Sequence, residues 1–117
     1  MPQITLEHST HFDATDWRAL ALEIHRLCVV VVSAALPACK TRIVRCENLI
    51  IADGAPEQAM VHCDLRILSG RTQEQKTALG EAVQAALLAG VAPYDGPRQI
   101  SVEIGNLGRE NYRKVTL

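Results

Sequence analysis

One segment of the chain, residues 59–67, limits the possible folds more than any other. Every second residue in it is apolar and most of those between are polar, which is the period-two pattern of a strand with one buried face. Thr72 and Gln75 then have the spacing of a helix capping box, ahead of an amphipathic stretch that Gly90 ends. Apolar and polar residues alternate again over residues 100–104. This order predicts a β-α-β unit, whose crossover between parallel strands should be right-handed.

The first half of the chain shows the same order of patterns. Residues 3–7 alternate as a strand does, and apolar residues recur at helical spacing from about residue 16 to residue 35. Pro37 provides a stop for this helix, and extended chain resumes at residues 42–44. The valines at 29–32 favour a strand by intrinsic propensity, which competes with the helical spacing.

Two such units predict the fold class and the domain organisation. We expect one domain over residues 1–117, with one repeat at about 2–50 and a second at about 57–106. The fold class should be α/β, as two layers: a mixed four-stranded sheet with two helices on one face. Aromatic residues make up only 3% of the chain, so aliphatic side chains must form the core. The other sheet face is left uncovered and is not entirely polar, so we expect the chain to oligomerise.

Charge and hydropathy exclude several kinds of partner. The formal net charge is −1, which provides no long-range attraction to nucleic acid or to an anionic membrane. The most apolar run, residues 27–37, is too short to span a bilayer, and residues 2–16 lack the pattern of a signal peptide. We therefore expect no nucleic-acid partner, no membrane association and a cytoplasmic location.

Cysteine and histidine spacings do not indicate a metal site. The four cysteines contain no Cys-x-x-Cys pair, and the four histidines contain no His-Glu-x-x-His pattern. Free thiols packed as small apolar groups are the expected state of the cysteines. His62 lies on the polar side of the strand at 59–67, where we expect a hydrogen-bonded structural histidine.

Three basic residues are candidates for binding an anion. Arg71 directly follows the strand at 59–67 and precedes a helix, a position where α/β units bind anionic ligands. Its guanidinium group could hold a carboxylate through two parallel hydrogen bonds, although a solvated loop arginine explains the position equally well. Lys40 and Arg42 alternate on one face of a strand, where a solvated sheet edge is the alternative interpretation.

The opening Met1-Pro2 raises a separate possibility. Proline is tolerated at the first residue of a strand, where its missing N–H group matters least, and this alone explains Pro2. An initiating methionine is, however, generally removed ahead of a small second residue. Removal of Met1 would leave the secondary amine of Pro2 at the start of a strand. The residues alone leave both interpretations of Pro2 open.

A family resemblance bears on this choice. The residues that carry it are Met1-Pro2, Pro37, Lys40-Thr41-Arg42, Ala52-Asp53-Gly54, Val61-His62-x-x-Leu65-x-Ile67-x-x-Gly70-Arg71 and Ser101-x-Glu103-Ile104. Through them the chain resembles the 5-carboxymethyl-2-hydroxymuconate Δ-isomerase family of the tautomerase superfamily, nearly from end to end. The resemblance implies a homotrimer of chains with two β-α-β units each, a pocket near the subunit boundaries, and no cofactor. It also implies an isomerase of aromatic-compound catabolism that acts on a small unsaturated oxo or hydroxy diacid.

The resemblance assigns roles to four residues. The amine of Pro2 would be the general base, moving a proton from a 2-hydroxymuconate-type dienol to carbon and leaving a 2-oxo unsaturated diacid. Arg71 would stabilise the developing negative charge, and Lys40 and Arg42 would bind the substrate. Lys40 stands where the family commonly has arginine, which keeps the charge but loses the planar two-pronged contact. The alternatives are a keto–enol tautomerase of another small enol acid and a non-catalytic oligomeric binding protein. The tail, residues 108–117, shows no period and receives no role.

Overall fold

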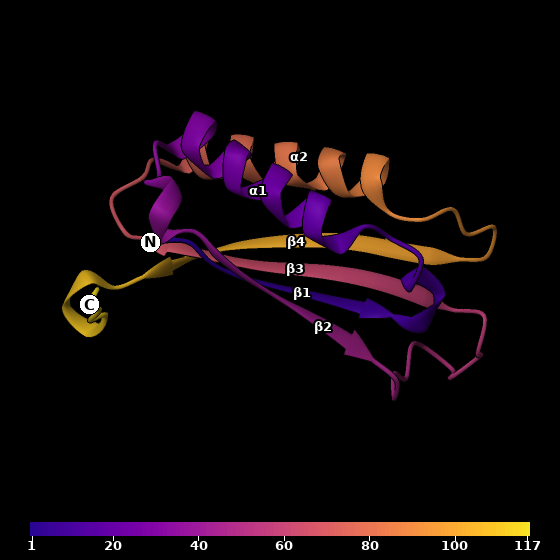
Figure 1. The fold of residues 1–117 in the computed structure, drawn as a ribbon. Helices are drawn as coiled ribbons and strands as arrows, with labels where there is room; N and C mark the ends of the chain where they lie inside the picture. Colours follow the sequence, from indigo (N-terminus) through magenta and orange to yellow (C-terminus); the bar gives the residue numbers. More distant parts are fainter.

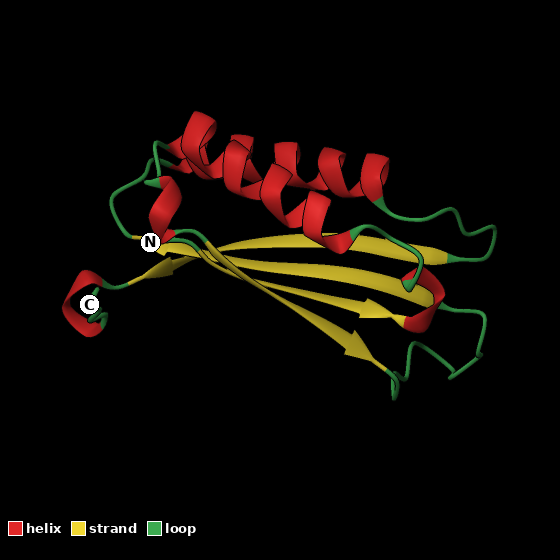
Figure 2. Cartoon of the chain, in the orientation of Figure 1, coloured by secondary structure: helices red, strands yellow, loops and turns green.

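The computed structural model describes all residues, 1–117, as two layers. Figure 1 shows both helices on one face of a four-stranded sheet, and Figure 2 shows that loops join the elements at the two ends of the sheet. The predicted fold class is therefore confirmed. The strands are β1 (Gln3–Ser9), β2 (Lys40–Cys46), β3 (Ala59–Leu68) and β4 (Arg98–Leu107), and the helices are α1 (Trp17–Val32) and α2 (Gln73–Gly90). Three short 3-10 turns are η1 (Thr10–Phe12), η2 (Leu36–Ala38) and η3 (Arg109–Asn111).

The order of strands in the sheet is β2-β1-β3-β4. Each outer strand runs parallel to its inner neighbour, as a β-α-β crossover requires, whereas the two inner strands β1 and β3 are antiparallel. Gln3 at the start of β1 consequently pairs with Lys40 in β2 and with Arg66 near the end of β3. The start of the first unit and the end of the third strand therefore meet at one end of the sheet.

Helix α1 is shorter than its hydrophobic period predicts. It ends at Val32 rather than near residue 35, because Ser33 adopts a left-handed conformation with φ 56°. The N–H of Ser33 donates to the carbonyl of Val29 and the N–H of Ala34 donates to the carbonyl of Cys28, each across 3.1 Å. The bond from Ser33 to Val29 is that of an αL helix end, formed without the usual glycine. The valines before it are helical because tertiary packing outweighs their strand propensity, and Val32 is buried in the core.

Helix α2 begins as the sequence predicts. The side-chain oxygen of Thr72 accepts a hydrogen bond from the backbone N–H of Gln75, and the Gln75 side chain accepts one from the backbone N–H of Thr72. The capping box is therefore complete. The core between the helices and the sheet is aliphatic, and Phe12 is the single fully buried aromatic side chain. His8 stacks on Trp17 at its border, with ring centroids 4.4 Å apart.

The face of the sheet away from the helices carries many polar side chains. His62 Nδ1 and the Ser101 hydroxyl are hydrogen-bonded to each other at 2.7 Å. The prediction of a hydrogen-bonded histidine is therefore confirmed. Two acceptor atoms on this face, Gln3 Oε1 and Asp64 Oδ1, are buried without any hydrogen-bond partner. Such atoms are uncommon in folded proteins because each loses its hydration without compensation. Neither helix of the structure is long and apolar enough to cross a membrane.

Candidate active site

Strand pairing brings Pro2, Lys40 and Arg71 to the same end of the sheet. Pro2 precedes β1, and Arg71 follows β3, which is antiparallel to it. Lys40 begins β2, and its backbone N–H donates to the carbonyl of Pro2 across 3.2 Å. The side chain of Pro2 is fully buried. Proline costs this strand little, since it stands ahead of the first ladder residue.

The side chain of Arg71 is held by backbone carbonyls. Its Nε–H donates to the carbonyl of Val32 at 3.2 Å, and Nη1 donates to the carbonyl of Leu68 at 3.4 Å. Val32 is the last residue of α1, where carbonyl groups lack a partner in the helix and carry the negative end of its dipole. Gly70 makes the turn before Arg71 with φ 123°, a conformation that side chains disfavour. The arginine is therefore oriented by both β-α-β units, and Nη2 is left for another acceptor.

The amino group at this end of the chain is less basic than a free α-amine. In the structure it belongs to Met1, one residue ahead of Pro2. Burial lowers its pKa, and the positive charge of Arg71 lowers it further. Lys114 and Arg109 act in the same direction with smaller effects, and Cys39 acts in the opposite direction. An amine at this position gives up its proton more readily than it would in water.

Two thiols lie beside the amine. Burial, with a smaller contribution from the neighbouring Cys39, raises the pKa of Cys28 to about 12. Burial also raises the pKa of Cys39, while the amino terminus and Lys40 lower it. All four cysteines of the chain are free. The two thiols are therefore neutral near pH 7, and they contribute an apolar wall rather than a charge.

The structure separates the two predicted substrate-binding residues of β2. Lys40 lies next to Pro2, and its Nζ donates to the carbonyl of Ala38 at 3.1 Å, so two of its donor hydrogens remain. Arg42 lies two residues further along the strand, opposite Thr5. The side chains of Lys40 and Arg42 are both exposed, and neither is among the charges that shift the pKa of the terminal amine. Only Lys40 directly adjoins Pro2.

Three residues of the tail also reach this end, and the sequence pattern missed them. The parallel pairing of β4 with β3 sets Leu107 opposite Leu68, so the chain after β4 leaves on the side where Arg71 lies. Nothing in the tail has a periodic pattern that could have revealed this. Its one signal is a concentration of positive charge. The contacts are Arg109 Nε to the Ser69 carbonyl at 3.0 Å, Gln3 Nε2 to Tyr112 OH at 3.0 Å, and Lys114 Nζ to Met1 Sδ at 3.7 Å.

The cations of this end have no carboxylate partners. No Asp or Glu oxygen lies within 4.0 Å of Arg71, Lys40, Arg109 or Lys114, whereas elsewhere three other arginines are paired with acidic residues. A group of unpaired cations around a weakly basic amine is suited to bind an anion and to exchange a proton with it. No group of three His, Cys, Asp or Glu residues is arranged to hold a metal ion.

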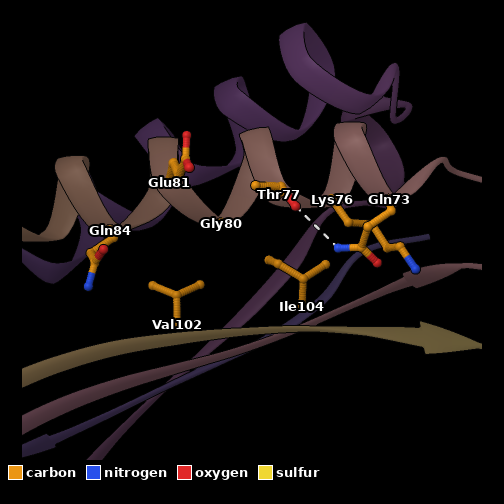
Figure 3. A pocket seen from close by; sticks show the side chains of 8 residues that line it. All are labelled: Gln73, Lys76, Thr77, Gly80, Glu81, Gln84, Val102 and Ile104. Atoms are coloured by element: carbon orange, nitrogen blue, oxygen red, sulfur yellow. Dashed lines mark hydrogen bonds between the residues drawn. The ribbon is translucent and has the colours of Figure 1, made fainter.

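The surface hollows of the isolated chain lie away from these residues. Three hollows lie on its surface, and none is lined by Pro2, Arg71 or Lys40. The most prominent is a groove between α2 and β4, shown in Figure 3, where Val102 and Ile104 of the strand face Thr77 and Gly80 of the helix. This groove contains none of the candidate residues. The candidate residues thus lie outside every hollow of the single chain.

Comparison with known proteins identifies a family. The model of the 5-carboxymethyl-2-hydroxymuconate isomerase family matches residues 2–115. No curated protein matches the chain by sequence. Solved structures do match by fold. A 5-carboxymethyl-2-hydroxymuconate isomerase from Deinococcus radiodurans R1 has a TM-score of 0.86 at 22% identity, with 99% of this chain and 90% of that chain covered.

Two further structures share the fold. A 5-carboxymethyl-2-hydroxymuconate delta-isomerase has a TM-score of 0.76 at 20% identity, over 99% of this chain and 88% of its own. A fused 4-OT described as a wild-type symmetric trimer has a TM-score of 0.74 at 17% identity, over 93% of this chain and 90% of its own. At these identities the structural likeness establishes the tautomerase fold.

Proposed function

The chain belongs to the 5-carboxymethyl-2-hydroxymuconate isomerase family and is an isomerase; from this we propose that it isomerises a 2-hydroxymuconate-type dienol diacid with the amine of Pro2 as general base. One observation carries the proposal more than any other. The amino-terminal end of the chain is fixed and partly buried among cations that have no protein carboxylate to neutralise them.

The base works after removal of Met1. The neutral secondary amine of Pro2 accepts the proton of the 2-hydroxy group, and the electrons of that O–H bond form the 2-oxo carbonyl. The dienol π electrons move along the chain, and a carbon at its far end takes a proton back from the prolinium group. The amine therefore starts and finishes neutral, and no net proton is consumed. An α-amine ordinarily has a pKa of about 7.7–8.0. Burial and Arg71 lower the pKa of the Met1 amine in the structure, and the same surroundings would favour the neutral form of a Pro2 amine.

Arg71 stabilises the charge that develops during the transfer. Deprotonation of the 2-hydroxy group places negative charge on that oxygen, next to a carboxylate that is already ionised. Two backbone carbonyls fix the guanidinium through Nε and Nη1, so the free edge of Arg71 is oriented before substrate binds. A preorganised donor of this kind favours the charged transition state without a cost of reorientation. Lys40 binds the substrate anion at the same end of the sheet through its two free ammonium hydrogens. Arg42 attracts the anion from further along β2.

We assign a homotrimer as the active assembly. No hollow of the single chain is lined by the candidate residues, and the polar sheet face contains two buried acceptors without a hydrogen bond, Gln3 Oε1 and Asp64 Oδ1. Asp64 Oδ1 has only an ion pair with Arg66 Nε at 3.7 Å. A neighbouring subunit against this face would supply donors and cover the site. The fused 4-OT of the same fold is a symmetric trimer, which favours three subunits over two.

A substrate panel tests the proposal. Protein whose intact mass shows that Met1 has been removed is mixed with 2-hydroxymuconate, and the loss of the dienol absorbance is followed. A pyruvoyl enol with one carboxylate serves as the comparison substrate. We expect faster conversion of the diacid. Conversion of the monoacid alone would identify a keto–enol tautomerase of another enol acid, and no conversion of either would leave a binding protein.

A further inference from the structure

The tail after β4 lies across the proposed site through three contacts from different residues. Arg109 donates from Nε to the carbonyl of Ser69 at 3.0 Å, and Tyr112 accepts a hydrogen bond from Gln3, the first residue of β1, at 3.0 Å. Lys114 lies 3.7 Å from the Met1 sulfur. The tail therefore contacts both the turn before Arg71 and the first residue of β1, and these two contacts do not involve Met1.

Arg109 is fixed in a way that leaves its terminal nitrogens available. Its Nε–H is used by Ser69, which is two residues before Arg71. Its Nη2 lies 3.7 Å from the point where a Cβ atom at Gly70 would be, so the guanidinium group covers the turn between β3 and Arg71. The side chain is exposed and has no carboxylate within 4.0 Å. The guanidinium group of Arg109 thus lies against the turn that leads into Arg71, and the terminal nitrogens of Arg109 make no hydrogen bond.

Another arginine in the same tail shows that this placement is selective. Arg113 donates to the carbonyl of Glu110, three residues before it, and it is not among the charges that lower the pKa of the terminal amine. Arg109 and Lys114 are among those charges. A position in the tail alone therefore does not bring an arginine to the site.

We propose that Arg109 is a specificity-determining residue that binds the second carboxylate of a dianionic substrate, while Arg71 acts on the oxygens at the reacting end. The inference rests on the proposed function in its choice of substrate. An exposed guanidinium with two free N–H groups on one edge matches a carboxylate in a bidentate pair. A substrate with only one carboxylate leaves this group without a partner. The tail, which has no sequence period, would in this way select diacids over monoacids.

Binding of unreactive probes tests the assignment without turnover. Adipate has six carbons and two carboxylates, and hexanoate has the same length with one. Each is titrated into the wild type, Arg109→Gln and Arg113→Gln, with the amide resonance of Gly70 as readout. A charged hydrogen-bonded contact contributes about 1.5–3 kcal/mol, so we expect Arg109→Gln to weaken adipate binding by about tenfold or more. Hexanoate affinity should change by less than about threefold, and Arg113→Gln should match the wild type for both probes.

Equal weakening of both probes in Arg109→Gln, or equal loss in Arg113→Gln, would overturn the assignment, since either result would report a general effect of charge. Arg109→Lys keeps the charge and loses the bidentate edge, so it should recover only part of the adipate affinity.

In turnover of the diacid, Arg109→Gln should raise KM by about tenfold and leave kcat within about threefold. If the wild type prefers adipate through Arg109 but converts no dienol, the proposed function fails and the assignment of Arg109 stands. If dienol turnover and diacid preference are both unchanged in Arg109→Gln, the assignment fails and the proposed function stands.

Discussion

The Nε–H of Arg71 donates to the carbonyl oxygen of Val32 across 3.2 Å, so the last turn of the first helix orients a side chain that follows the third strand. This bond exists because Ser33 leaves the helix in a left-handed conformation and ends it at Val32. The proposed oxyanion-stabilising group of the second β-α-β unit is thereby fixed by the first.

Replacement of Arg71 by alanine should lower kcat/KM for the diacid by about two to three powers of ten, the range measured for the loss of one preorganised oxyanion donor. The loss of the bond to Val32 should reduce stability by only about 1 kcal/mol. Arg98→Ala is the matched control, because Arg98 also donates to two backbone carbonyls, those of Tyr94 and Gly96, at the opposite end of the sheet. Steady-state kinetics and thermal unfolding of both variants check this. Equal effects of the two substitutions would argue for a structural role of Arg71.

The pH dependence of kcat/KM should report the terminal amine. Burial and the charge of Arg71 both disfavour the ammonium form and lower the amine pKa, so the neutral base is populated from a lower pH. Activity should therefore rise with pH through one ionisation below the ordinary 7.7–8.0 of an α-amine. In Arg71→Ala the same ionisation should move to higher pH, because one cause of the lowered pKa is gone. A profile that is unchanged in this variant would contradict the amine as base.

Retention of Met1 should abolish proton transfer. With Met1 attached, the nitrogen of Pro2 is an amide, which has no basicity. A Pro2→Leu variant keeps an apolar side chain at this buried position but should prevent removal of Met1, whereas Pro2→Ala should still be processed and keep a primary amine. We expect no detectable turnover from the first and partial turnover from the second, with intact mass verifying the state of Met1. Full activity of any protein that still carries Met1 would refute the mechanism.

Lys40 and Arg42 should differ in their effects on substrate binding. Lys40 adjoins Pro2 through a backbone hydrogen bond, and Arg42 lies opposite Thr5 further down the strand. Lys40→Ala should raise KM by several-fold, on the order of the 0.2–1 kcal/mol of an exposed charge contact, while Arg42→Ala should have the smaller effect. Lys40→Arg should retain or improve diacid binding, since it restores a bidentate group. A larger effect of Arg42→Ala would show that the substrate lies along β2 and away from the terminus.

The protein should sediment as a homotrimer at micromolar concentration, at about three times the 12.8 kDa mass of one chain. The reason is that no hollow of the single chain is lined by the candidate residues and that the polar sheet face contains two buried acceptors. Asp64→Ala removes one of those acceptors and should shift the assembly equilibrium, which sedimentation velocity would measure. A stable monomer of the unaltered chain would refute the assembly and the shared site together.

Much of the fold could be predicted from the sequence because local patterns determine it. The alternation before Gly70 and the capping box at Thr72 fix one strand and one helix start without reference to the rest of the chain. The end of α1 could not be placed, since the left-handed residue there is Ser33 rather than the glycine that usually reveals such an end. The apolar residues 49–51 resemble a strand yet lie in a loop, with Ile50 84% exposed.

The site was predicted less completely, for a different reason. Arg71 could be selected because it follows a strand end where anions bind, and Lys40 because it alternates with Arg42 on one strand face. Pro2 was selected through the family resemblance. Arg109 and Lys114 reach the same place only through the register of β4 on β3, which depends on contacts between residues far apart in the chain. No periodic pattern in the tail reports that register, so three-dimensional structure was needed to find it.

The antiparallel pairing of β1 and β3 gives the sheet two similar ends, and this determines the stoichiometry of the enzyme. At one end the chain terminus precedes β1, and at the other Gln58 precedes β3 beside Ser9 and His11, where the backbone is continuous. An internal residue has no free amine, whatever the side chains around it. Under the proposed mechanism each polypeptide has one reactive centre for its two structural repeats, and a reagent that titrates the amine of Pro2 would consume one equivalent per chain, three per proposed trimer.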